Sequence, residues 1–107
     1  MQEWRVEMKA SDVLIEDEIT GELFISINGL IEYLQEPKRI VMTMINYYLY
    51  TMLFREDIDI FYNKITIKCF NKLKSDYEHR GTSDRELDNI SEAYYKRRNE
   101  ILNAREG

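Results

Sequence analysis

The chain has few of the residues that build metal sites, phosphate loops and disulfide frameworks. Its 107 residues include one cysteine, one histidine, one proline and four glycines. A single cysteine excludes an internal disulfide, and together with one histidine it cannot complete a structural zinc site. Four scattered glycines leave no glycine-rich phosphate loop. We therefore expect no metal and no cofactor, and a reducing cytoplasm is the simplest location for a chain without disulfides.

The sequence also lacks an apolar run long enough to cross a membrane. Its longest charge-free segment, Ile40–Phe54, would reach about 22 Å as a helix, whereas a bilayer core is about 30 Å thick. The first twenty residues carry several charges and only one short apolar run, Val13–Ile15, so they do not resemble a signal peptide. We expect a cytoplasmic protein without membrane contact, which buries Ile40–Phe54 in its core or at an oligomer interface.

What the sequence does contain is typical of a folded, acidic protein. Hydrophobic residues make up 44% of the chain and aromatic residues 12%, and the length predicts a single domain over residues 1–107. Residues 1–36 carry nine acids and two bases, whereas residues 37–107 carry eleven acids and thirteen bases. Because the first third is acidic, we expect a basic partner and no direct contact with nucleic acid there. The abundance of Ile, Tyr, Asn and Lys, which have mostly AT-rich codons, indicates a low-GC genome.

The hydrophobic patterns predict an α+β fold, with a small N-terminal antiparallel sheet packed on three to four helices. Large apolar residues flank Thr20-Gly21 and predict a hairpin over residues 13–18 and 22–27, and residues 3–8 could add a strand. Residues 28–34 fit either a strand or a short helix capped by Asn28, and the helix is favoured.

Three longer helices complete the predicted fold. A central apolar helix covers residues 38–54, and Pro37 precedes it. A helix capped by Asp57 covers residues 57–79, with a strand at residues 65–67 as the alternative. The last helix begins at a capping box over residues 83–86 and continues to about Ala104.

Two groups of residues are candidates for binding a partner. The first is an acidic cluster at the predicted hairpin, whose alternative is a solvated turn. The second is a polar stripe on the central helix, opposite Val41, Ile45, Tyr48, Leu49 and Met52, whose alternative is a core helix with a mildly polar back. Tyrosine-rich, charge-depleted surfaces are favoured in interface cores. The acidic cluster comprises Glu16, Asp17, Glu18 and Glu22, and the stripe comprises Thr43, Asn46, Tyr47 and Tyr50.

Residues 25–45 resemble the helix-turn-helix of small excisionase-type regulators, in which a strand leads into a short helix, a tight turn and a second helix. Apolar residues stand where that motif requires them, at Leu30, Leu34, Val41 and Met44. Ile31, Gln35 and Glu36 depart from it, replacing a small residue, the turn glycine and an apolar residue. The resemblance implies a DNA-binding regulator that offers Lys38, Arg39, Thr43 and Asn46 to bases.

No catalytic arrangement is predicted. Cys69 and His79 lie ten residues apart on one predicted helix, which separates them by about 80° around the axis and about 15 Å along it. They therefore do not form a nucleophile pair. We expect a non-enzymatic protein that inhibits or regulates a basic protein or nucleoprotein. In size, charge and codon usage it resembles small acidic phage and mobile-element proteins such as anti-CRISPR or anti-restriction inhibitors and antitoxins. The alternatives are the DNA-binding regulator and an assembly subunit that forms homodimers through residues 38–54.

Overall fold

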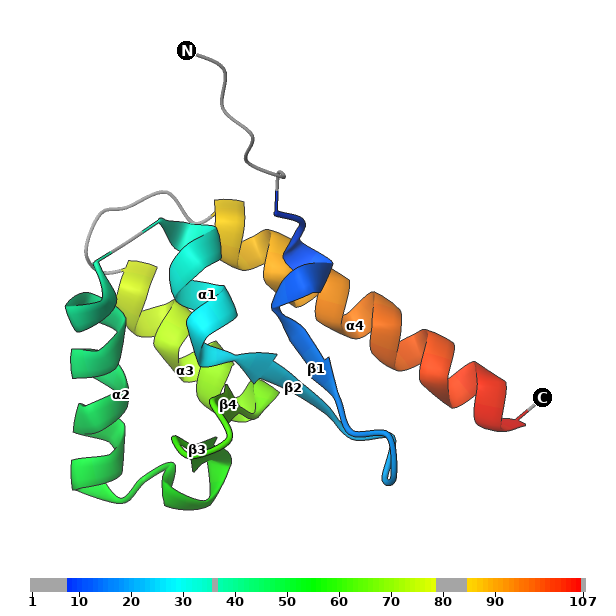
Figure 1. Cartoon of the computed structure of the whole chain (residues 1–107), viewed down its shortest axis with the longest axis horizontal. Coiled ribbons are helices and arrows are strands. Elements are labelled where there is room, and N and C mark those ends of the chain that lie inside the picture. Colours follow the sequence, from blue (N-terminus) through cyan, green and yellow to red (C-terminus); the bar gives the residue numbers. More distant parts are fainter. Residues whose placement is uncertain (1–7, 36, 79–84, 107) are drawn as a thin grey trace, which may run out of the picture.

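The structure, a computed structural model, describes residues 8–35, 37–78 and 85–106, without the side chains of Glu78 and Glu106. The fold is α+β, as the sequence predicted: a four-stranded antiparallel sheet packs with four α-helices (Figure 1). In chain order the elements are η1 (Ala10–Val13), β1 (Leu14–Glu16), β2 (Leu23–Ser26), α1 (Ile27–Leu34), α2 (Lys38–Thr51), η2 (Arg55–Asp57), β3 (Ile58–Asp59), β4 (Lys64–Ile65), α3 (Ile67–Glu78) and α4 (Arg85–Glu106).

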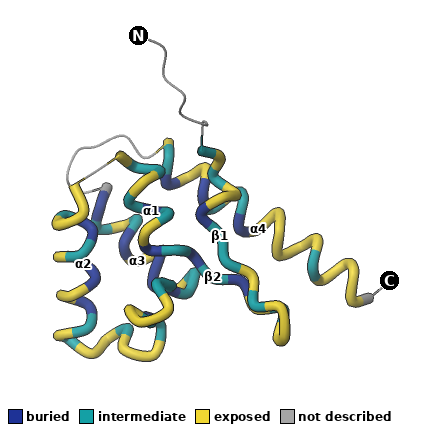
Figure 2. The backbone as a smooth tube through the Cα atoms, viewed as in Figure 1, coloured by how far each residue is buried: buried dark blue, intermediate teal, exposed yellow. Residues whose placement is uncertain are grey.

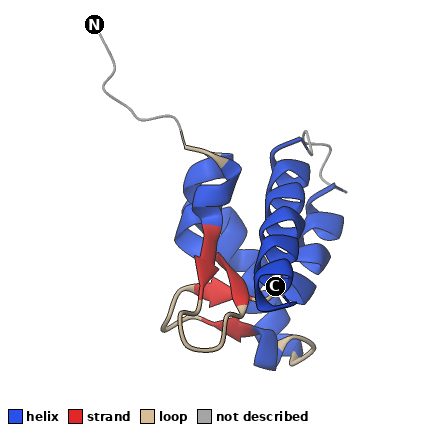
Figure 3. Cartoon of the chain, turned by 90° about the vertical axis from the view of Figure 1, so that its right-hand side faces the viewer, coloured by secondary structure: helices blue, strands red, loops and turns tan. Residues whose placement is uncertain are grey.

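The sheet combines two hairpins that are far apart in the sequence. Its strand order is β1-β2-β4-β3, and every neighbouring pair is antiparallel. Ile25 of β2 lies opposite Ile65 of β4, and both side chains are fully buried. Figure 3 shows the strands gathered in the lower part of the molecule, with helices above them and to their right. The N-terminal hairpin is therefore stabilised by a second hairpin as well as by helices.

The core lies between the sheet and the inner sides of the helices, where Figure 2 shows the buried segments. It is built from apolar side chains of the four α-helices, the sheet and Val13, and none of the described charged residues is buried. The largest fully buried side chains are those of Tyr48, Phe70, Ile25, Leu30, Ile45, Ile65, Leu73, Leu87 and Ile90. None of the described helices is both long and apolar enough to cross a membrane.

The helix α1 confirms the prediction of a short helix over residues 28–34, but its cap is not the predicted one. The Oγ atom of Ser26 accepts a hydrogen bond from the backbone N–H of Gly29 at 2.9 Å, so Ser26 is the N-cap. Asn28 lies inside the first turn instead. Its backbone N–H donates to Oδ1 of Asn63 at 2.8 Å.

Asn63 comes from the turn between β3 and β4 and connects that turn to the start of α1. Its backbone oxygen accepts from the N–H of Ile27 at 3.0 Å, and its Nδ2 donates to Oγ of Ser26 at 3.0 Å. Asn63 has a φ of 58°, a left-handed conformation that asparagine adopts more readily than most residues. One residue therefore both shapes the turn and supplies partners to the free N–H groups of α1.

The helix α2 is shorter than predicted. It ends at Thr51, because Met52 adopts a left-handed conformation with a φ of 63° and its N–H bonds to the oxygen of Leu49. Met52 was expected on the buried side of the helix, and this is wrong: its side chain is 61% exposed. Val41, Ile45 and Tyr48 are buried as expected, and Leu49 is partly buried.

The single helix predicted over residues 57–79 is wrong over residues 57–66. Residues 57–66 form the end of η2, the hairpin of β3 and β4 and the start of the next connection, and α3 begins only at Ile67. The strand considered at residues 65–67 is present in part, as β4 over Lys64–Ile65. Asp57 and Asp59 are consequently not acids of a first helical turn. Asp57 accepts from the hydroxyl of Thr66 at 2.9 Å, and Asp59 accepts from the N–H of Tyr62 at 3.0 Å.

The last helix is close to its prediction, since α4 covers Arg85–Glu106. Two other predictions cannot be compared with the fold. The predicted capping box covers residues 83–86, and residues 83–84 lie outside the described residues. The possible strand covers residues 3–8, and residues 3–7 lie outside them too. His79 lies outside them as well. Met8, the one described residue of that possible strand, is not in a strand.

Candidate functional site

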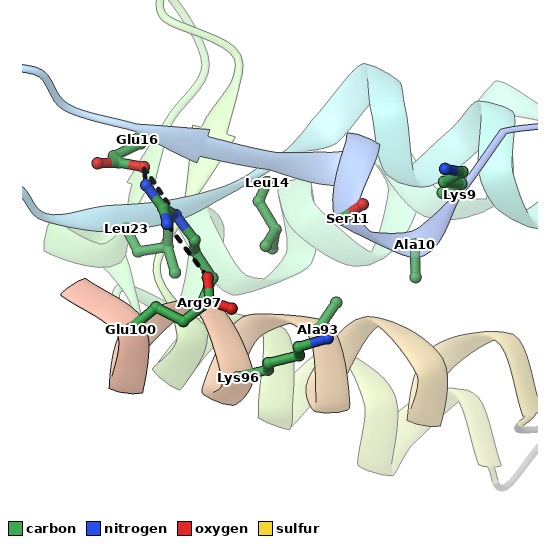
Figure 4. Close-up of a pocket in the computed structure, with 10 residues that line it drawn as sticks. All are labelled: Lys9, Ala10, Ser11, Leu14, Glu16, Leu23, Ala93, Lys96, Arg97 and Glu100. Carbon is green, nitrogen blue, oxygen red and sulfur yellow. Dashed lines mark hydrogen bonds and ion pairs between the residues drawn. The ribbon is translucent and has the colours of Figure 1, made fainter. Parts of the chain in front are cut away.

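The structure gives two of the four predicted acidic residues a role inside the chain. Glu16, at the end of β1, accepts hydrogen bonds from Nε and Nη2 of Arg97 on α4, at 3.1 and 2.8 Å (Figure 4). Asp17 accepts from the backbone N–H groups of Ile19 and Thr20, at 2.8 and 3.0 Å. These bonds hold the pKa of the Asp17 carboxyl below its ordinary value. Both residues therefore contribute to the hairpin, each through one of its two carboxylate oxygens.

Glu18 and Glu22 are exposed, and their carboxylates have no hydrogen bond or ion pair in the described part of the chain. Glu22 lines a cavity of about 270 Å³ between the two hairpins, and three further acidic residues, Glu56, Asp57 and Asp59, line it as well. Sequence reasoning missed this grouping, because it placed Asp57 and Asp59 at the start of a helix. The pairing of β2 with β4 therefore brings Glu22 close to further acids that the predicted acidic cluster did not include.

All four residues of the predicted polar stripe on α2 are exposed. Tyr47 is 61% and Tyr50 86% exposed, and Thr43 and Asn46 lie on the same outward side. Figure 1 shows α2 at one edge of the molecule, far from the turn between β1 and β2. The α2 stripe (Thr43, Asn46, Tyr47, Tyr50) and the predicted acidic cluster therefore do not form one continuous site.

Exposed large apolar side chains are concentrated in the last turns of α2 and in the segment that follows it. The described part of the chain exposes ten large hydrophobic residues, and seven of them fall between residues 47 and 62. They come from the last turns of α2, the connection to η2 and the turn between β3 and β4. We call this set the aromatic end: Tyr47, Tyr50, Met52, Leu53, Ile60, Phe61 and Tyr62. Leu53 is 69% and Phe61 86% exposed.

The aromatic end continues onto the open side of the sheet through Lys64. The ammonium group of Lys64 lies 4.1 Å from the ring centre of Phe24 and 5.7 Å from that of Tyr62. Such placement over an aromatic face is favourable for a cation. Phe24 and Lys64 also line the cavity that contains Glu22, so aromatic rings and carboxylates share one surface. This surface could accept the cationic side chains of another macromolecule.

The segment that resembles a helix-turn-helix forms two helices joined by three residues, 35–37. Gln35 stands where the motif usually has glycine, and it adopts the left-handed conformation, with a φ of 56°, that glycine would provide. The departure at Gln35 therefore does not prevent the turn. Ile31 is partly buried against the core, so a larger residue is accommodated there. The hairpin of β3 and β4 follows α2 and adds to the sheet next to β2.

Metal-binding clusters are not found among residues 8–35, 37–78 and 85–106, and the one cysteine is buried. No three His, Cys, Asp or Glu side chains among these residues could hold a metal ion. Cys69 is fully buried, and burial, together with the negative charge of Asp57, raises the pKa of its thiol to about 12. A thiol in this state is a poor nucleophile.

We compared the chain with known proteins. No protein-family model, no curated protein sequence and no solved structure matches it.

Proposed function

We propose that the protein is a non-enzymatic binding protein that inhibits or regulates a basic macromolecular partner by direct contact through its aromatic end. The observation that carries the proposal is the concentration of exposed large apolar side chains between residues 47 and 62. Folded monomers rarely expose large apolar patches, and such patches often mark interaction sites. Tyrosine is among the residues enriched in interface cores.

The charge of the partner is inferred from the acids beside the aromatic end. Glu22, Glu56 and Asp59 line one cavity there, and Lys64 is the only cation among the residues that line it. An excess of carboxylates next to aromatic rings favours lysine and arginine side chains on the partner, and it would speed the encounter with a basic surface. Small acidic inhibitors from phages and mobile elements are the functional class that best fits this combination.

A second candidate function is DNA binding through α2. The observation in its favour is the connection between α1 and α2, in which Gln35 takes the left-handed conformation usual for glycine. The helix α2 also contains no acid and begins with Lys38 and Arg39. Against it stand the small number of cations on this face and the acids around Glu56.

The experiment uses the full chain as bait and compares two exposed substitutions with a matched control. Tyr50→Ser and Phe61→Ser remove aromatic rings from the aromatic end, whereas Tyr95→Ser removes an exposed ring from α4. A partner captured from extracts of low-GC bacteria should be basic and should bind Tyr95→Ser like the wild type. Either substitution at the aromatic end should weaken binding about thirtyfold, the effect of losing an interface hot spot of about 2 kcal/mol.

Salt and DNA provide the discriminating measurements. Affinity for a basic protein should fall as salt rises, and Glu22→Gln with Glu56→Gln should reduce that salt dependence, whereas Glu92→Gln on α4 should not. If the affinity did not change with salt concentration, the proposed electrostatic contribution to partner binding would be wrong. Specific retardation of DNA fragments from the gene's own locus, lost in Lys38→Gln with Arg39→Gln, would replace the proposal with the second candidate.

A further inference from the structure

The ammonium group of Lys64 lies over aromatic rings on the outer face of the sheet. Its Nζ is 4.1 Å from the ring centre of Phe24 and 5.7 Å from that of Tyr62. Alternate residues of a strand point to opposite faces, and the neighbouring Ile25 and Ile65 are buried in the core, so Phe24 leaves the outer face together with Lys64. The pairing of β2 with β4 brings the ring and the ammonium group together, and the contact therefore exists only in the folded sheet.

This ammonium group shares a cavity with acids but pairs with none of them. Lys64 and Phe24 line the cavity of about 270 Å³ together with four acidic residues. No carboxylate of the described residues lies within ion-pair distance of the Lys64 ammonium. Glu22, one of the four acids, has no other partner for its carboxylate there. The rings therefore hold Lys64, and a carboxylate beside them remains available to a second cation.

We propose that Lys64 occupies the place that an arginine side chain of the partner takes on binding, and that Lys64 thereby limits the affinity of the contact. The inference rests on the proposed function and identifies the side chain that enters this cavity. Arginine fits best, because its planar guanidinium stacks on an aromatic ring while it donates to a neighbouring carboxylate. The cavity offers both, through Phe24 and Glu22.

Lys64 competes with the arginine because both need the same ring. Two positive charges on one aromatic face repel each other, so the ammonium group has to move away before a guanidinium stacks on Phe24. The Lys64 side chain is long, flexible and only half-buried, so it can move without disturbing the backbone of β4. A contact between a cation and a ring is weak at an exposed site, and its displacement corresponds to about a threefold loss of affinity. Lys64 therefore lowers the affinity without blocking the cavity.

The test measures the binding of one cationic side chain and needs no identified partner. The probe is Nα-acetyl-arginine amide, its uncharged counterpart is Nα-acetyl-citrulline amide, and binding is followed by amide chemical shifts in NMR. The arginine probe should shift amides of residues 22–24 and 57–66 in a saturable manner. Lys64→Met keeps an apolar stem beside Phe24 without the charge, and it should bind the probe about threefold more tightly than the wild type. Lys96→Met removes an exposed charge from α4 and should leave the affinity unchanged.

A second pair of variants protects the test against changes in folding. Lys64→Gln should tighten binding as Lys64→Met does, and urea unfolding should show that both variants fold. Adding Phe24→Leu to Lys64→Met should remove the gain, because the ring on which the guanidinium stacks is lost.

Four results would overturn the inference. They are binding of the citrulline probe as tight as that of the arginine probe, no gain of affinity in Lys64→Met and Lys64→Gln, an equal gain in Lys96→Met, and a gain that survives Phe24→Leu. Failure of the proposed function would appear elsewhere, as a captured partner that binds Tyr50→Ser and Phe61→Ser like the wild type. Neither of these substitutions removes a residue that lines the cavity, so both should leave the affinity for the arginine probe unchanged.

Discussion

Substitution of Asn63 is expected to destabilise the protein far more than its place in a partly exposed turn suggests. Asn63→Ala removes the acceptor of the Asn28 N–H bond and the donor to Ser26, both at the start of α1. Each lost hydrogen bond costs about 1 kcal/mol, and alanine at a φ of 58° adds about 1 kcal/mol of backbone strain. The free energy of unfolding should therefore fall by about 3 kcal/mol.

Two further variants separate these contributions. Asn63→Gly tolerates the positive φ but still lacks the side chain, so it should lose about 2 kcal/mol. Asn71→Ala removes an exposed asparagine from α3 and should change stability by less than about 0.5 kcal/mol.

The assay is urea unfolding followed by far-ultraviolet circular dichroism, with the midpoint compared at constant m-value. In a domain of this size the thermal midpoint of Asn63→Ala should fall by roughly 10–20 °C. A loss below about 0.5 kcal/mol in Asn63→Ala would refute the idea that this turn caps α1. If Asn63→Ala and Asn63→Gly lost the same free energy of unfolding, the contribution of backbone strain would be refuted, but the contribution of the hydrogen bonds would not.

The remaining predictions concern two titratable groups. Because the backbone N–H groups of Thr20 and Ile19 lower the pKa of Asp17 below 3.8 in the folded state, its stabilising effect is present above that pH and is lost as the pH falls through the folded pKa. Urea unfolding between pH 6 and pH 2.5 should show a smaller acid-dependent loss in Asp17→Asn than in the wild type, and Glu18→Gln should behave like the wild type. The buried thiol of Cys69, with a pKa of about 12, should not react with a disulfide reagent at pH 8 until the protein unfolds, and labelling of the native protein at the rate of a free thiol would contradict its burial.

Local patterns were sufficient to predict most of the elements. The apolar periodicity of Val41, Ile45 and Tyr48 and the stripe on α4 each identified a helix, because a helix that packs on a core repeats its apolar residues every three to four positions. The first hairpin was also predicted, but β1 and β2 are shorter than residues 13–18 and 22–27, and residues 17–22 connect them. Gly21 in this connection has a positive φ of 76°, which glycine adopts readily.

The region around β3 and β4 was mispredicted because two periods fit the same residues. Ile58, Ile65 and Cys69 are compatible with one helical stripe, yet the backbone turns back on itself between Ile58 and Ile65. The local signals for that turn are Asp59, which accepts a bond from Tyr62, and Asn63 in its left-handed conformation. Asp59 and Asn63 favour a turn, and here their effect was stronger than the helical spacing of the apolar residues. Both are turn-favouring residue types, so the turn could have been predicted from the sequence.

The predicted site depended on contacts that a sequence does not reveal. Glu16 and Arg97 are 81 positions apart, so the loss of Glu16 as a free acid could not be foreseen from its neighbours. The meeting of Glu22 with Glu56 likewise follows from the pairing of β2 with β4. The exposure of Tyr47 and Tyr50 could be foreseen, because the opposite side of α2 is plainly apolar.

The bonds of Asn63 to the start of α1 also set an order for synthesis on the ribosome. Residues 27–34 leave the ribosome long before Asn63, and an eight-residue helix is unstable alone in water. The strand β2, which pairs with Lys64 and Ile65, must wait for the same segment. The first third of the chain therefore remains without its final contacts until the second hairpin is made, and nascent chains that stop before residue 63 should be readily cut by protease within residues 23–34, whereas those that extend well beyond it should not.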